Sequence, residues 1–153
     1  MNIVLASDHA GYPIRKRLAG YLESLGHTIV EHGAENDVDA YSYVPAGLAA
    51  VADIQNGTAH MGIVICGTGI GISMVCNKNE GVRCALCTDE FMARMAREHN
   101  DANVLALGAR VIGQGLAVSI TDAFLHTDFE AGGRHQARVT EIKGIEEKVF
   151  RHS

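Results

Sequence analysis

Short apolar runs alternate with amphipathic stretches along almost the whole chain. Five runs rich in Val, Ile, Leu and Ala are typical of strands that are buried on both faces of a parallel sheet. These expected strands cover residues 2–7, 28–31, 63–65, 82–87 and 104–107. The stretches between and after them place apolar residues at helical spacing, which predicts helices over 13–25, 45–54, 72–77, 89–99, 113–125 and 136–149.

Five repeats of strand then helix, joined by short connections, predict right-handed crossovers and a parallel sheet covered on both faces. We therefore expect a Rossmann-like three-layer α/β domain with a five-stranded parallel sheet and an extra C-terminal helix, spanning 1–153 as a single domain. Ligands of such sheets bind outside the carboxyl ends of the strands. The loops at Asp8–His9, Cys66–Gly71 and Asp89 should then meet at one crevice. The last helix needs a cover for its apolar stripe, and a second copy of the chain is one solution.

Composition narrows the function classes. With 153 residues, 47% of them hydrophobic, the chain is long enough for one domain with a substantial core. A net charge of −5 and the lack of a basic stripe argue against a nucleic-acid partner. No apolar run is long enough to span a membrane and no signal-peptide pattern is present, so we expect a cytoplasmic protein. Four cysteines do not suggest a disulfide framework, and the pair Cys84 and Cys87 should point to opposite faces of a strand.

The glycine-rich segment after the third expected strand is the strongest local signal for chemistry. The apolar run 63–65 ends at Cys66, and Gly67, Gly69 and Gly71 follow before the next helix begins. Glycines let the backbone approach a ligand closely, and the N–H groups of a helix N-terminus favour negative charge. Cys66 could be an inert buried thiol or a nucleophile or base that faces a bound anion.

A nicotinamide dehydrogenase is the first alternative that this architecture raises. Its fingerprint places Gly-x-Gly-x-x-Gly after the first strand. Here the spacing is Gly67-x-Gly69-x-Gly71, it follows the third strand, and the first loop contains only Gly11. One domain also leaves no room for a separate substrate domain, so the pattern disfavours this class.

Several separate motifs together carry a family resemblance over nearly the whole chain. They are Asp8-His9-Ala10-Gly11, the segment from Ile65 to Ser73, Asn77-Lys78, Arg97-Glu98-His99-Asn100, Gly108-Ala109-Arg110-Val111, and Gly132-Gly133-Arg134-His135-Gln136 with Arg138. In these the chain resembles the type B ribose-5-phosphate isomerases, a family that includes galactose-6-phosphate isomerase subunits. The resemblance implies a homodimer or a tetramer that needs no metal, nucleotide or other cofactor, and an active site shared between subunits.

The resemblance also implies residue roles. Cys66 matches the base of an aldose–ketose isomerase, Thr68 assists it by hydrogen bonding, and His99 matches the residue that opens the sugar ring. An imidazole is suited to that proton transfer, and the helix N-terminus behind Cys66 would favour its thiolate. The other matched residues bind substrate: Asp8, His9, Tyr43, Gly67, Gly69, Ile70, Gly71, Asn100 and the phosphate clamp Arg110, Arg134 and Arg138. Arg134 and Arg138 would reach the partner subunit's site.

Some of these residues could instead have a purely structural role. His99 near a helix end could interact only with the helix dipole, and Arg134 and Arg138, one turn apart, could form a solvated face. One segment departs from the family pattern, because Ser42-Tyr43-Val44-Pro45 stands where the family usually has Asp-Tyr-Pro.

The sequence therefore predicts interconversion of ribose 5-phosphate and ribulose 5-phosphate through an enediolate. Because the departing loop lines the sugar's distal end in the family, the same chemistry on a tetrulose phosphate or on allose or galactose 6-phosphate is the alternative. A non-catalytic sugar-phosphate-binding module is the alternative of another class.

Overall fold

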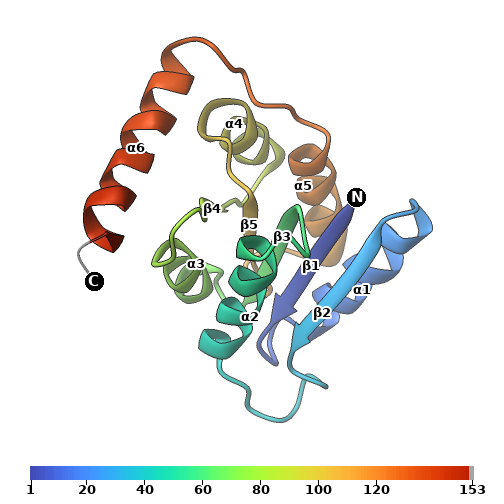
Figure 1. The fold of residues 1–153 in the computed structure, drawn as a ribbon. Helices are drawn as coiled ribbons and strands as arrows, with labels where there is room; N and C mark the ends of the chain where they lie inside the picture. The colour runs from blue at the N-terminus through green and yellow to red at the C-terminus, as the bar shows by residue number, and fades with distance from the viewer. Residues whose placement is uncertain (152–153) are drawn as a thin grey trace.

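The computed structural model describes residues 1–151 and contains one five-stranded sheet with helices on both faces (Figure 1). The strands are β1 (Asn2–Ser7), β2 (Thr28–Gly33), β3 (Met61–Cys66), β4 (Cys84–Leu86) and β5 (Val104–Gly108). All neighbouring strands pair in parallel, in the order β2-β1-β3-β5-β4. This confirms the Rossmann-like α/β fold with a five-stranded parallel sheet.

Two groups of helices cover the two faces of the sheet. The helices are α1 (Tyr12–Ser24), α2 (Tyr43–Gln55), α3 (Ile70–Asn77), α4 (Glu90–Asn100), α5 (Gln114–Leu125) and α6 (Arg134–Phe150). Helices α1, α4 and α5 pack their apolar residues on one face of the sheet, and α2 and α3 pack on the other. Cys84 packs in the second of these cores and Cys87 in the first, which confirms that the two thiols lie on opposite faces.

Most element boundaries differ from the sequence prediction by one or two residues, and three of the differences have a visible structural reason. Helix α2 begins at Tyr43 rather than at residue 45, because the Ser42 hydroxyl accepts a hydrogen bond from the Val44 N–H and caps the helix. Strand β4 is shorter than the predicted 82–87 because it pairs only with β5, at the edge of the sheet. Strand β2 continues past residue 31 to Gly33, opposite Ser7 of β1.

The order of the strands creates a switch point between β1 and β3. From β1 the chain moves outward to β2 in one direction, and from β3 it moves toward β5 and β4 in the other. Helices that follow β1 and β3 therefore pack on opposite faces of the sheet, and the loops between lie at its carboxyl edge, where ligands of such sheets bind. Because the strands are parallel, each connecting helix returns the chain to the opposite edge, where the next strand begins. Helix α4 starts after β4 at the carboxyl edge and so ends at the amino edge, before β5.

Helix α6 lies at the side of the molecule. The segment from residue 126 to 133 passes α4 and leads into α6, which contacts α4 and then runs past β4 toward α3, where the Glu146 carboxylate accepts a hydrogen bond of 3.1 Å from the N–H of Gly81 (Figure 1). Its apolar side chains Ile142, Ile145 and Val149 remain exposed. Within residues 1–151, no helix combines the length and apolar character that crossing a bilayer requires.

Candidate active site

Cys66 is the last residue of β3 and lies at the base of the glycine loop. Its side chain is buried, and its Sγ accepts a hydrogen bond of 3.2 Å from the N–H of Gly69. Gly69 has φ of +78°, and a Cβ there would lie 2.9 Å from the carbonyl carbon of Leu107. The loop can adopt this turn because position 69 is glycine, which removes both the backbone strain and the clash. The turn places the thiol sulfur beside the start of α3.

Thr68 stands at the exposed tip of the same loop. Its Oγ1 accepts a hydrogen bond of 3.2 Å from the N–H of Ile70, whose side chain is also exposed. The hydroxyl hydrogen of Thr68 is thus available to a ligand above the loop, because the oxygen acts as the acceptor in this contact. Two N–H groups of the loop, those of Gly69 and Ile70, are directed at the side chains of Cys66 and Thr68.

The loop after β1 lies directly against this segment. The N–H of Asp8 donates to the carbonyl of Ile65, and the buried Asp8 carboxylate accepts a hydrogen bond of 2.9 Å from the N–H of Gly11. His9 Nδ1 accepts a hydrogen bond of 3.1 Å from the N–H of Tyr41. The same nitrogen lies 3.4 Å from the Tyr41 carbonyl, so the backbone of Tyr41 holds the His9 ring in place from the next loop.

Tyr43 and Arg110 border the glycine loop from two other elements. A Cβ on Gly71 would lie 2.6 Å from Cζ of Tyr43, so the tyrosine ring packs directly on that glycine. A Cβ on Gly67 would lie 3.1 Å from Nη1 of Arg110, and the Arg110 N–H donates to the Gly67 carbonyl at 2.8 Å. The carboxyl edge of the sheet therefore brings together Asp8, His9, Tyr43, the segment from Cys66 to Gly71, and Arg110.

Asp89, the third loop residue expected at this edge, caps a helix. Its carboxylate accepts a hydrogen bond of 2.8 Å from the N–H of Met92 and caps α4. This occupies one carboxylate oxygen with the start of the helix.

The remaining candidate residues lie at the opposite edge of the sheet. His99 and Asn100 are the last two residues of α4, and Asn100 borders a groove that Val82 and Arg83, at the amino end of β4, also line. Arg134 and Arg138 are exposed in the first turns of α6. Within one chain, the structure thus separates His99, Asn100 and the two arginines from Cys66.

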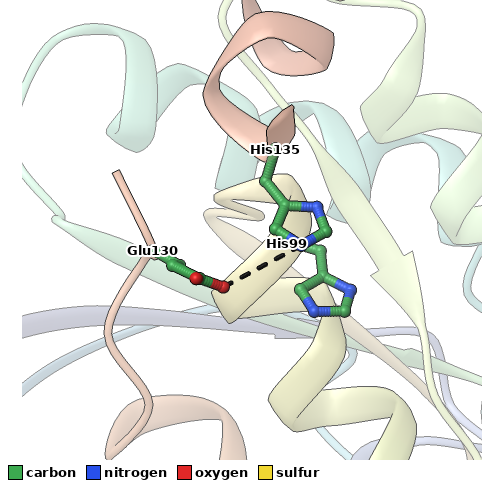
Figure 2. Close-up of side chains that lie close together, drawn as sticks. All are labelled: His99, Glu130 and His135. Carbon is green, nitrogen blue, oxygen red and sulfur yellow. Dashed lines mark ion pairs between the residues drawn. The ribbon is translucent and has the colours of Figure 1, made fainter. Parts of the chain in front are cut away.

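A compact group of side chains surrounds His99 (Figure 2). Its ring stacks on that of His135, with ring centres 3.8 Å apart and planes inclined by 9°. His135 Nε2 lies 3.9 Å from Oε2 of Glu130, and His99 Nε2 lies 3.6 Å from Oε1 of Glu98. Burial lowers the pKa of His135 below its usual value, and the nearby His99 and Arg134 lower it further.

The sequence and structure match known proteins in the same way over nearly the whole chain. The family model described as Ribose/Galactose Isomerase matches residues 3–142. The chain belongs to the ribose/galactose isomerase family. It is therefore an isomerase, and the sequence resemblance is confirmed at the level of the family.

Individual members of the ribose/galactose isomerase family match at almost full length. Ribose-5-phosphate isomerase B of Escherichia coli is 39% identical over 148 residues, which cover 95% of this chain and 97% of that protein. Galactose-6-phosphate isomerase subunit LacB of Clostridium acetobutylicum is 38% identical, covering 97% of this chain and 84% of the subunit. The solved structure of Clostridium thermocellum ribose-5-phosphate isomerase B superposes with a TM-score of 0.93 at 45% identity, covering 97% of this chain and 99% of that one.

The structure adds two supporting residues that the sequence interpretation did not identify. Arg15 is 5% exposed and donates to Ser7 Oγ, to the carbonyls of His32 and Ala34, and to the Glu31 carboxylate. It therefore joins the end of β1 to the loop that carries Tyr41. A basic residue among apolar positions on the inner face of the first helix was the available signal.

His135 is the second supporting residue that the sequence interpretation did not identify. It follows Arg134 within one of the family motifs, but sequence order alone did not show that it faces His99.

Proposed function

We propose that this isomerase interconverts ribose 5-phosphate and ribulose 5-phosphate through an enediolate, in a single sugar-phosphate isomerase domain spanning 1–153. The observation that carries the proposal is the arrangement at the carboxyl edge. There a thiol, a hydroxyl, a carboxylate and an exposed guanidinium surround a glycine loop and a helix N-terminus. Such a site can remove a proton beside a carbonyl and stabilise the negative oxygen that results.

The proposed reaction begins with ring opening and continues with proton transfer. His99 takes the proton of the anomeric hydroxyl and delivers a proton to the ring oxygen, so that the bond between C1 and the ring oxygen breaks and an aldehyde forms. The Cys66 thiolate then takes the proton from C2, and the electron pair moves onto the carbonyl oxygen. Thr68 and free N–H groups of the glycine loop stabilise this enediolate. A proton then passes from the O2 hydroxyl to O1, and return of the proton from Cys66 to C1, as the O2 electron pair forms the new carbonyl at C2, yields the ketose.

The remaining residues bind the substrate in this proposal. Asp8, His9 and Tyr43 contact its hydroxyls or its phosphate end, and Gly67, Gly69, Ile70 and Gly71 line the loop. Arg110, Arg134 and Arg138 bind the phosphate, since guanidinium groups match pairs of phosphate oxygens. Asn100 contacts the sugar beside His99. No metal or other cofactor takes part.

We further infer that the active site combines two copies of the chain. Cys66 and His99 occupy opposite edges of one sheet, whereas the proposed chemistry needs both at one sugar. A two-fold homodimer resolves this, because it can bring the amino edge of one copy to the carboxyl edge of the other, twice. The exposed apolar residues of α6 supply surface for such contact. Two dimers forming a tetramer would preserve the same sites.

The loop that departs from the family pattern bears on the choice of sugar. Ser42 caps α2 and Tyr43 packs on Gly71, so the loop that differs from the family pattern lies beside the candidate site. A tetrulose phosphate or allose or galactose 6-phosphate would use the same Cys66 and His99 chemistry. A binding module without catalysis is disfavoured by the retention of Cys66, Thr68 and His99. The expected cytoplasmic location remains a prediction.

The first experiment is turnover of ribose 5-phosphate in deuterated water, following ketose formation and deuterium at the carbon beside the carbonyl. Cys66→Ala should remain folded and lose both signals, whereas Cys84→Ala, at a half-buried thiol outside the site, should retain them. Arg134→Ala should mainly raise KM. Retained turnover in Cys66→Ala would reject Cys66 as the base. Binding of sugar phosphate without exchange would favour the non-catalytic module, and turnover of tetrose or hexose phosphates alone would change the substrate.

A further inference from the structure

His99, Glu130 and His135 form a cluster of metal-ligand type, of which the proposed isomerisation uses only His99 and uses no metal. Each offers one ligand atom, and these three atoms lie within 4.8 Å of one another. They come from three different segments: the end of α4, the linker before α6, and the first turn of α6 (Figure 2). The linker is held at this place because the Glu130 N–H donates to the carbonyl of Glu98 at 3.0 Å.

The donor set suits a borderline divalent cation. Two imidazoles and one carboxylate, with a fourth position for water, are the ligands of an open tetrahedral zinc site. Ligand atoms around Zn²⁺ stand about 3.3 Å apart for bond lengths of about 2.0–2.1 Å. The cluster must therefore contract slightly, and its stacked rings must tilt so that their in-plane lone pairs converge.

The exposure of the side chains shows how this contraction can occur. The His135 side chain is only 9% exposed and forms a fixed base, whereas His99 is 32% exposed and Glu130 is 64% exposed. The latter two can adjust around His135. The negative charges of Glu98 and Glu130 favour a bound cation, and the positive charges of Arg134 and Arg138 oppose one.

We propose that His99, Glu130 and His135 form a binding site for Zn²⁺, with water as the fourth ligand, and that the bound ion inhibits the enzyme. The ion is a regulator of the site and not a cofactor. Inhibition follows because the His99 lone pair that binds zinc can no longer exchange a proton with the sugar hydroxyl. This second half rests on the proposed role of His99 in ring opening, whereas the binding site itself does not.

The test of the site is direct zinc binding, measured by competition with a chromophoric zinc chelator at neutral pH. Glu130→Gln and His135→Gln should each weaken binding by about tenfold or more, as expected for loss of a ligand. Glu141→Gln, which removes an exposed carboxylate from α6, is the matched control and should bind like the wild type. Circular dichroism confirms that each variant is folded.

Two outcomes of this titration would overturn the site. One is equal zinc affinity in the wild type and in both ligand variants, which would place the ion elsewhere on the surface. The other is loss of zinc binding in Cys66→Ala with retention in Glu130→Gln, which would assign the ion to the thiol.

Activity then tests the inhibition separately. Zinc should slow wild-type ketose formation, and Glu130→Gln should keep its turnover while becoming less sensitive to zinc by a similar factor. Zinc binding at the cluster without inhibition of an active enzyme would reject the regulatory half. If the protein turned over no sugar phosphate at all, the proposed function would fail while the titration still decided the binding site.

Discussion

Mixing two inactive variants tests the division of the active site between the edges of the sheet. Cys66→Ala removes the proposed base from the carboxyl edge, and His99→Ala removes the proposed ring opener from the amino edge. If each active site takes these residues from different chains, a dimer of one Cys66→Ala chain and one His99→Ala chain has one site with both native residues. Its second site lacks both.

The expected recovery follows from counting these sites. Equal amounts of the two variants, after subunit exchange, form about half mixed dimers by random pairing. Because one of two sites is intact in each, the mixture should regain about a quarter of wild-type activity. Mixed dimers isolated through two different affinity tags should reach about half. The assay is the initial rate of ketose formation from ribose 5-phosphate, compared with each variant alone.

The double variant Cys66→Ala/His99→Ala provides the matched control. Mixed with an equal amount of wild type, it should leave about a quarter of the sites active, because only wild-type dimers retain complete sites. A site contained within one chain would leave about half. Isolated mixed dimers of the two single variants that show no activity above the parents would refute the shared site, and with it the inference from strand order.

Three further predictions concern the supports of the site. Arg15→Met should lower the free energy of unfolding by about 3–5 kcal/mol in urea titrations, because it leaves buried acceptors unpaired. Arg17→Met, at an exposed position, should change that free energy by less than about 0.5 kcal/mol. Equal effects of the two substitutions would show that Arg15 does not stabilise the fold through these contacts. Gly71→Ala should displace the exposed Tyr43 ring and raise KM with little change in melting temperature, and an unchanged KM would show that the ring does not contact substrate. Burial raises the pKa of Cys87 to about 11, so the folded state retains that proton longer than the unfolded state, and unfolding free energy should fall as the pH rises from about 8.5 toward 11. Cys87→Ala should show a smaller decline over this range, and an identical decline would contradict the shift.

The bounds of a helix or strand were predictable from the sequence where neighbouring residues alone determine them. The apolar run of β1 was predicted at its observed bounds, since a strand buried on both faces leaves no ambiguity in pattern. Pro45 suggested a later start for α2, yet the third position of a helix tolerates proline because its N–H has no intrahelical partner there. The start of β4 depends on a contact with the segment before β5. The Arg83 N–H donates to the side chain of Asn103 rather than to the backbone of the sheet, so the strand does not include Arg83. That contact joins positions twenty residues apart, which a local pattern does not reveal.

The candidate site likewise has parts that the sequence predicts and parts that depend on tertiary contacts. The grouping of Asp8 and Cys66 at one edge followed from the general rule for parallel sheets. The placement of His99 at the other edge was also available, since a helix after the fourth strand must return the chain to the amino edge. In contrast, the stacking of His99 on His135 and the contact of Tyr41 with His9 depend on how long connecting segments fold back. Such approaches are set by tertiary packing.

The placement of Cys66 and His99 at opposite edges has a consequence for how the rate depends on protein concentration. If two copies share each active site, as proposed, a lone chain holds half of each site and converts no sugar. Dilution below the concentration at which the subunits separate would then lower the number of complete sites with the square of the chain concentration, so that specific activity would decline on dilution and recover when the protein is concentrated again. At chain concentrations in that range, a modest drop in the amount of the protein would cause a disproportionate drop in the rate of the reaction.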